Sequence, residues 1–242
     1  MQIKSVDISA TYKLAGTLLT PDNINKEIPA VIFYHGMVSK SKPRTVERAK
    51  RVAEKGIAAL AFDFRGCGES DGKLGEISLK NWLDDALLAF DYLANQGFVD
   101  KKRIGIAGKS FGGYMAAFVC QQRTVTSMVL HAPAVYPDSW FNKPYQPTND
   151  IEHQRLMYRK SPEAFHNKAI RAIEKYKNPL LVVGSELDDT CPKHIVEGFY
   201  NLCPAKQKEM YWIKGADHPL TNEKHNEEYI MMMTKWFVRS LT

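Results

Sequence analysis

The chain has 242 residues, of which 44% are hydrophobic and 25% are charged, values typical of an ordinary globular protein. This length favours one large α/β domain, which can bury a substantial core without disulfide staples. The net charge of +6 does not predict a nucleic-acid partner, because no run of Arg and Lys alternates with aromatic residues as a base-stacking surface requires.

The first twenty residues alternate between polar and apolar types with a period of about two, which predicts an antiparallel start to a sheet. They contain no apolar core of a secretory signal, and no apolar run in the chain reaches transmembrane length. We therefore expect a cytoplasmic location and no membrane partner. The four cysteines lack C-x-x-C spacing, which favours a reducing compartment and argues against a disulfide framework or a zinc site.

Strand-like and helix-like segments alternate along the rest of the chain, which predicts a mostly parallel sheet with helices on both faces. The apolar run AVIFY at 30–34 predicts a buried strand, and a helix at 44–55 and a strand at 57–64 follow it. The helix carries the densest basic stretch, which we interpret as a solvated face because Glu47 and Glu54 interrupt it. This stretch consists of Lys40, Lys42, Arg44, Arg48, Lys50, Arg51 and Lys55.

The same alternation continues in the second half. Ser78 is a plausible N-cap for a helix whose apolar stripe spans 79–93. A strand at 103–107 leads to a helix at 111–122, and a strand at 125–131 comes next. The remaining predicted elements are strands at 180–183 and 209–213 and helices from about 192 and at about 222–239.

One segment breaks this rhythm, between the strand that ends at His131 and the strand that begins at Leu180. Its 48 residues are far more than a crossover with one helix needs. We interpret about 134–176 as a cap inserted over the active-site edge of a single domain spanning 1–242. A surface excursion that touches no substrate is the alternative. Aromatic rings can form the wall of a binding pocket, so we expect the aromatic residues of this cap to contact the substrate. These residues are Tyr136, Trp140, Phe141 and Tyr145.

The motif Gly108-Lys109-Ser110-Phe111-Gly112 has the G-x-S-x-G pattern between a predicted strand and a predicted helix. This is the context of a nucleophile elbow, which holds its serine in a strained backbone conformation with the hydroxyl exposed. Side chains at the two glycines would collide with neighbouring backbone. We therefore predict that Ser110 is a nucleophile.

A serine nucleophile needs a base, and the base needs a carboxylate partner. His218 is the best candidate base, because its loop lies between the last predicted strand and the last predicted helix. His131, at a strand end, is the alternative. Three carboxylates follow the strand at 180–183 and compete for the partner's role: Glu186, Asp188 and Asp189.

A tetrahedral intermediate also needs aligned N–H donors. We expect one from the backbone of Phe111, directly after the nucleophile, and one from Met37 in the loop after the strand at 30–34. His35 is then a structural residue and not a base. The sequence shows no ligand cluster for a metal or organic cofactor, and we expect none.

These motifs resemble those of the α/β-hydrolase superfamily over nearly the whole chain, in the order Ser, acid, His. The matching segments are HGM at 35–37, DFRGCGES at 63–70, GKSFGG at 108–113, DDTCP at 188–192 and GADH at 215–218. The resemblance implies that 63–70 shapes the site as structure and not as chemistry. It also implies that the acid lies four residues before a proline, which selects Asp188 before Pro192. The spacing from Gly184 to Asp188 is one residue longer than in the common pattern.

By pattern the chain is most similar to dienelactone hydrolases and to cinnamoyl or feruloyl esterases. The resemblance implies a hydrolase that cleaves small aryl or medium acyl carboxylic esters through an acyl-serine intermediate. A thioesterase or a peptidase with the same triad, or a binding protein without catalysis, are the alternatives. The expected partner is a small-molecule ester, and a homodimer is compatible with the sequence.

Overall fold

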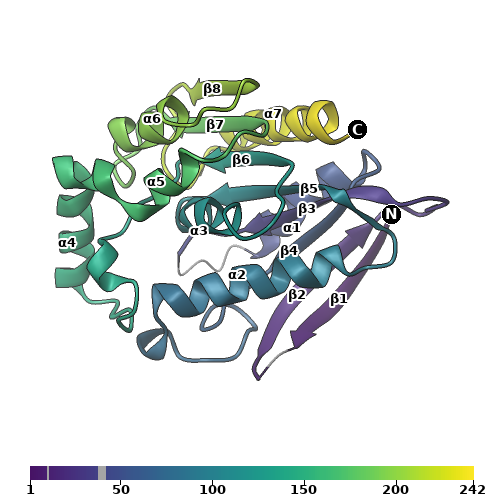
Figure 1. Cartoon of the computed structure of the whole chain (residues 1–242), viewed down its shortest axis with the longest axis horizontal. Helices are drawn as coiled ribbons and strands as arrows, with labels where there is room; N and C mark the ends of the chain where they lie inside the picture. Colours follow the sequence, from purple (N-terminus) through teal and green to yellow (C-terminus); the bar gives the residue numbers. More distant parts are fainter. Residues whose placement is uncertain (10, 38–41) are drawn as a thin grey trace.

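The computed structural model of the chain describes residues 1–9, 11–37 and 42–242, so Lys40 of the basic stretch lies outside the described residues. One sheet of eight strands runs through the molecule, with helices on both faces (Figure 1). The strands are β1 (Gln2–Ser9), β2 (Lys13–Thr20), β3 (Ile28–Tyr34), β4 (Ala58–Phe62), β5 (Val99–Lys109), β6 (Ser127–His131), β7 (Leu180–Ser185) and β8 (Lys208–Ile213).

The strand order is β1-β2-β4-β3-β5-β6-β7-β8. β2 pairs antiparallel with both β1 and β4, whereas the pairs from β4 through β3 to β8 are parallel. The predicted antiparallel start and the mostly parallel sheet are therefore confirmed. Parallel neighbours bring the carboxyl ends of their strands to one edge, where ligands bind in open α/β sheets.

The helices divide between the two faces of the sheet. α1 (Lys42–Ala53) and α7 (Glu223–Leu241) contribute to one hydrophobic cluster, which packs on the face that includes Val31 and Val129. The helices of the other cluster are α2 (Leu79–Ala94), α3 (Phe111–Val119), α5 (Lys168–Ile173) and α6 (Lys193–Asn201). Because helices bury β3 on both sides, its sequence is a continuous apolar run.

Several elements differ by a few residues from their predicted bounds, among them β5 and α3. β5 begins at Val99 and not at 103, because Val99 pairs with Ile28 before an irregularity in the register. α3 ends at Val119, three residues earlier than predicted, and Cys120 is its C-cap. Ser78 does cap α2, as expected, through a reciprocal capping box with Asn81.

The β6–β7 segment, residues 132–179, contains two short 3-10 turns (Asp138–Trp140 and Pro162–His166), α5 and the additional helix α4 (Asn149–Lys160). In Figure 1, α4 lies beyond the edge at which the parallel strands end. Its residue Arg159 is completely buried and donates to the carbonyls of Val135 and Thr190, which ties the helix to the loops after β6 and β7. Among the described residues, no helix combines the length and the apolar character needed to cross a membrane.

Candidate active site

Ser110 lies in the tight turn between β5 and α3, with φ 51° and ψ −113°. A positive φ is uncommon for a residue with a side chain, and its cost is met by surrounding structure. The Ser110 N–H donates to the carbonyl of His131 at 2.9 Å, and its carbonyl accepts from the N–H groups of Gly113 and Ala134. The strained turn expected from the sequence is thus present and is held from three sides.

The glycines of the turn are required by close backbone approach. A Cβ on Gly112 would lie 2.0 Å from the carbonyl oxygen of Tyr34, and one on Gly108 would lie 2.7 Å from the carbonyl oxygen of Gly112. Gly113 has a similar restriction, because its Cβ would meet Pro133 at 2.9 Å. Any side chain at these positions would push α3 away from the strand ends.

His218 and Asp188 form a hydrogen-bonded pair, with 2.7 Å between His218 Nδ1 and Asp188 Oδ2. The other carboxylate oxygen, Oδ1, accepts from the backbone N–H groups of Thr190 and Cys191, each at 2.8 Å. Three donors therefore hold the Asp188 carboxylate, whose side chain is 3% exposed. His218 and Ser110 both line a cavity of about 310 Å³ at the strand ends.

The competing residues have other partners. Glu186 is exposed and accepts from the N–H of Gly215 at 2.7 Å, and Asp189 is exposed and accepts from the hydroxyl of Thr190. His131 is completely buried between Ser185 and the Tyr229 ring, and burial lowers its pKa well below the ordinary value. The structure therefore brings Asp188, and not these residues, to His218.

The two predicted oxyanion donors flank Ser110. Phe111 begins α3, so its N–H has no acceptor within the helix. Gly36 and Met37 line the same cavity as Ser110, and a Cβ on Gly36 would lie 3.8 Å from the Cβ of Ser110. The geometry is compatible with a pair of N–H donors at this point.

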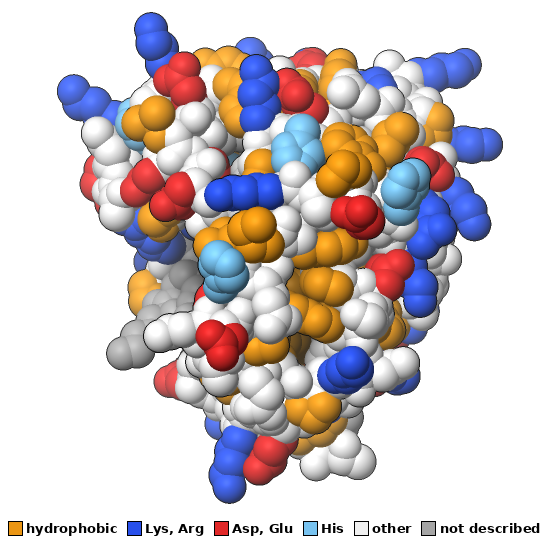
Figure 2. Space-filling view, turned by 90° about the vertical axis from the view of Figure 1, so that its left-hand side faces the viewer, with side chains coloured by type: hydrophobic (Ala, Val, Ile, Leu, Met, Phe, Trp, Pro, Cys, Tyr) orange, Lys and Arg blue, Asp and Glu red, His pale blue; other side chains and the backbone are white. Residues whose placement is uncertain are grey.

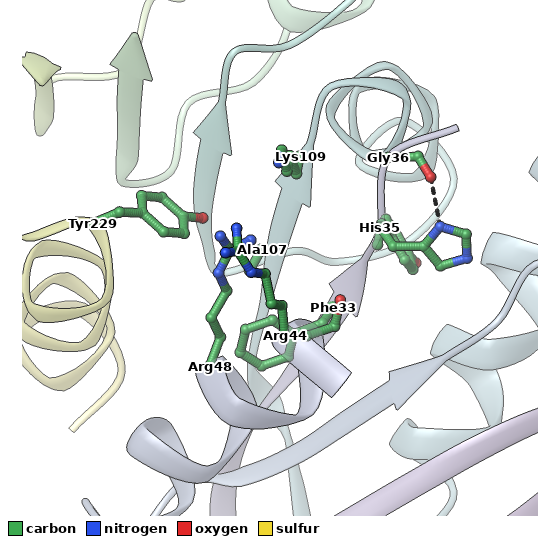
Figure 3. Close-up of a pocket in the computed structure, with 10 residues that line it drawn as sticks. Phe33, His35, Gly36, Arg44, Arg48, Ala107, Lys109 and Tyr229 are labelled. Carbon is green, nitrogen blue, oxygen red and sulfur yellow. Dashed lines mark hydrogen bonds between the residues drawn. The ribbon is translucent and has the colours of Figure 1, made fainter. Parts of the chain in front are cut away.

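His35 is bonded within the scaffold. Its Nδ1 lies 2.6 Å from the Gly36 carbonyl oxygen (Figure 3), while the N–H of Phe64 donates to Nε2 at 3.0 Å. These two bonds require the neutral tautomer with a proton on Nδ1. Burial lowers the pKa of His35, which agrees with a structural role.

Three cations, Arg44, Arg48 and Lys109, line one small pocket (Figure 3), and Lys109 directly precedes Ser110 in the chain. Lys109 and Arg44 both donate to the carbonyl of Pro219, directly after His218, at 3.2 Å. Burial, together with the neighbouring Arg48 and Arg44, lowers the pKa of Lys109 to about 7. These bonds restrain the loop that presents His218.

The side chains of the 63–70 segment bond to the surrounding scaffold, which agrees with the expectation that this segment shapes the site without taking part in the chemistry. Arg65 donates to Asp85 through Nε and Nη2, and the Ser70 hydroxyl donates to the Asp63 carbonyl at 2.6 Å. A Cβ on Gly68 would lie 2.2 Å from Asp63 Oδ2, so the loop closes tightly on itself. None of these residues lines the cavity with Ser110.

The four aromatic candidates of the β6–β7 segment separate in the structure. Tyr136 lines the cavity with Ser110 and packs edge-on against Phe111, whereas Phe141 packs against Phe118. Trp140 and Tyr145 line another cavity, of about 240 Å³. Figure 2 shows the end of the molecule that carries α4, where hydrophobic side chains gather in a hollow.

Arg155 and Arg159 of α4 are among the cavity residues that the sequence analysis did not predict. Their spacing of four residues places them on one face of a helix, a signal that was present in the sequence. Only the fold shows that this face is directed at the Ser110 cavity.

A metal-ligand cluster is conceivable at Asp188, Cys191 and His218, whose potential ligand atoms lie within 4.8 Å of one another. Burial raises the pKa of the Cys191 thiol to about 11, and the positive charge of Arg159 opposes this rise only in part. A metal would need the thiolate and would break the bond between Asp188 and His218. The donor set therefore favours the hydrogen-bonded pair over a metal centre.

Comparisons with known proteins agree with this architecture. The model of the prolyl oligopeptidase family matches residues 44–242. An uncharacterized protein of Mycobacterium tuberculosis is 28% identical over 192 residues, which cover 78% of this chain and 63% of the relative. The chain spans less than two thirds of the length of the curated relatives that it matches first.

Two solved structures share the fold over their whole length. Est1E from Butyrivibrio proteoclasticus, solved with bound ferulic acid, has a TM-score of 0.77 at 21% identity and covers 97% of this chain and 98% of its own. A dienelactone hydrolase from Anabaena variabilis has a TM-score of 0.73 at 20% identity and covers 100% and 99%. The predicted α/β-hydrolase fold is thereby confirmed.

Proposed function

The chain belongs to the prolyl oligopeptidase family of α/β hydrolases, and from that premise we propose that it is a serine hydrolase that cleaves carboxylic esters through an acyl-serine intermediate. One observation carries the proposal. Ser110, on a strained turn, shares a cavity with His218, whose imidazole is bonded to the buried carboxylate of Asp188. A nucleophile, a base and an orienting acid are the minimum set for acyl transfer.

In the first half-reaction, Ser110 Oγ attacks the ester carbonyl while its proton passes to His218 Nε2. Asp188 accepts from His218 Nδ1–H, which leaves Nε2 as the free base and stabilises the imidazolium that forms. The N–H groups of Phe111 and Met37 would donate to the oxyanion. Collapse of the intermediate breaks the bond to the leaving oxygen, which takes the proton from His218 and departs as the alcohol.

In the second half-reaction, water repeats the attack on the acyl-serine. His218 takes a proton from the water and returns one to Ser110 Oγ, which releases the carboxylic acid. All proton movements pass through one imidazole, so no cofactor is required by this scheme. Because the scheme relies on the His218 imidazole alone, its position matters, and the bonds from Lys109 and Arg44 to the Pro219 carbonyl restrain the loop that carries it.

A peptidase with the same residues is the second candidate, since the family model is named for prolyl oligopeptidases. The size of the cavity and the length of the chain favour the ester proposal. The cavity of about 310 Å³ suits a small acyl group, and two neighbours of matching length are Est1E with ferulic acid and a dienelactone hydrolase.

The test combines labelling with a substrate panel. A fluorophosphonate probe should label the wild type and not Ser110→Ala, and 4-nitrophenyl esters from acetate to octanoate should be hydrolysed with a preference for short or medium chains. Gly-Pro-4-nitroanilide serves as the peptidase substrate. Labelling with turnover of the anilide but not of the esters would reject the ester proposal, and no labelling would reject the serine mechanism.

A further inference from the structure

Among the residues that the structure describes, the cavity that Ser110 shares with His218 is lined by cations and by no carboxylate. Three basic residues line it, namely Lys109, Arg155 and Arg159. The Asp188 carboxylate is not part of the lining and already accepts hydrogen bonds from His218 and from two backbone N–H groups. This is a positive site in a hydrolase whose mechanism uses none of these charges.

Arg159 is the least expected of the three, because its side chain is 0% exposed. Nε donates to the Val135 carbonyl at 3.1 Å and Nη1 to the Thr190 carbonyl at 3.0 Å, and the guanidinium carbon lies 5.0 Å from the centre of the Tyr136 ring. Nη2 is buried and has no hydrogen-bond partner, and no ion pair to Arg159 occurs in the part of the chain that the structure describes. A buried charge without a counter-ion is costly unless a ligand supplies one.

Arg155 lies one helical turn earlier on the same face of α4 and lines the same cavity. Its Nη2 is paired with Glu152, which also accepts from the hydroxyl of Tyr145, and its Nε is buried without a partner. Glu152 therefore neutralises one of the two arginines. One positive charge and two donor nitrogens without a partner, Arg159 Nη2 and Arg155 Nε, therefore remain on residues that line the cavity with Ser110.

Lys109 adds only part of a positive charge at neutral pH, because its pKa is about 7, and its Nζ already donates to the Pro219 carbonyl. Recognition of an anion at the cavity therefore depends mainly on the two arginines.

We infer that this cavity binds a carboxylate carried by the substrate, which Arg159 and Arg155 recognise next to the ester that Ser110 attacks. The inference rests on the proposed function and names its substrate class, an ester with one free carboxylate. Guanidinium N–H groups match a planar carboxylate, and the aromatic face of Tyr136 holds one of them in place. The carboxylate can belong to the acyl part or to the alcohol part.

The experiment measures kcat/KM for matched ester pairs. For the acyl part, mono-4-nitrophenyl succinate is compared with its methyl ester. For the alcohol part, 4-carboxyphenyl butyrate is compared with 4-(methoxycarbonyl)phenyl butyrate. In at least one pair, the wild type should prefer the carboxylate by about tenfold to a hundredfold, the range expected for a charged hydrogen bond lost or gained.

Variants separate recognition from intrinsic reactivity. Arg155→Gln and Arg159→Gln should each lower the preference in that pair by about tenfold while changing kcat/KM for the neutral ester less. Arg171→Gln is the matched control, because this arginine of α5 is 58% exposed, is paired with Asp138 and does not line the cavity. Arg159 also holds α4 in place, so Arg155→Gln keeps the test valid if Arg159→Gln does not fold.

A binding measurement distinguishes failure of the inference from failure of the proposed function. Succinate, glutarate and 4-hydroxybenzoate should bind to Ser110→Ala in calorimetry and compete with one another, and Arg155→Gln in that background should weaken binding by about tenfold. Turnover of neutral esters without any carboxylate preference or binding overturns the inference and leaves the esterase in place. Binding of the acids without turnover of any ester supports the site and rejects the esterase.

Discussion

The two sides of the Ser110 cavity are built in different ways. On the sheet side, Ser110, Asp188 and His218 each follow a strand of the central sheet within a few residues, and backbone contacts hold them closely. On the α4 side, Arg155 and Arg159 come from a helix that two carbonyl bonds and one aromatic ring attach to the rest of the site. The comparison suggests that the chemistry depends on the sheet side and the selectivity on the α4 side. Each prediction below tests that division.

Ser110→Ala should have the largest effect. Loss of the nucleophile removes the covalent route, so kcat for a neutral 4-nitrophenyl ester should fall by about four orders of magnitude or more. The melting temperature should not decrease, because the Ser110 backbone and not its hydroxyl makes the bonds of the turn. If the variant kept more than a few per cent of the wild-type kcat, the chemistry would not lie on the sheet side.

Asp188→Asn should come next, with kcat lowered by about a thousandfold to ten-thousandfold, because the amide favours the wrong imidazole tautomer. Asp189→Asn and Glu186→Gln are matched controls on the same loop, with partners other than His218. Each control should cost less than about tenfold in kcat. If Asp189→Asn instead lowered kcat by about a thousandfold or more, Asp189 and not Asp188 would be the acid that orients His218.

Gly112→Ala should destabilise the protein as well as lower its activity. The added Cβ would lie 2.0 Å from the Tyr34 carbonyl oxygen, so β3 and α3 must separate. We expect a loss of about 3 kcal/mol in the free energy of unfolding, measured with urea. Gly97→Ala is the control, since nothing lies within 4 Å of its added Cβ. Equal stability of the two variants would show that the turn tolerates displacement.

Lys109 should make the stability of the sheet side depend on pH. Its pKa is about 7 in the folded protein and 10.5 in a free side chain, so the unfolded state binds more protons between these values. The free energy of unfolding should therefore increase from pH 7 to pH 10, by an amount on the order of 1–2 kcal/mol. Lys109→Met should remove most of this increase. An identical slope in the variant would contradict the assignment.

Thr148→Ala should have the smallest effect and should be confined to the α4 side. The Thr148 hydroxyl accepts from the N–H of Ile151 at the start of α4, and its loss should cost about 1 kcal/mol of unfolding free energy. If the two sides are independent, kcat for a neutral ester should stay within about twofold of the wild type. A tenfold loss of kcat would show that α4 also positions the reacting groups.

Several features of the fold could be predicted because they depend on neighbours in the sequence. The apolar run at β3, the Ser78 cap and the Ser110 turn each follow from steric and burial rules that act over a few residues. The ends of β5 and α3 could not be predicted, because pairing with Ile28 and the local geometry at Cys120 set them.

The same contrast holds for the site. The order of Ser110, an acid and His218 could be predicted from the sequence, as could the need for glycine at 108 and 112, and the family resemblance already favoured Asp188 as the acid. The folded chain adds the 2.7 Å contact between Asp188 and His218, and only its tertiary packing brings Arg155 and Arg159 to the cavity. The physical reason is distance along the chain. The bonds that place Arg159 join residues 24 and 31 positions apart, so they depend on how the whole β6–β7 segment packs. The four-residue spacing of the two arginines indicates a shared helix face but not what that face contacts.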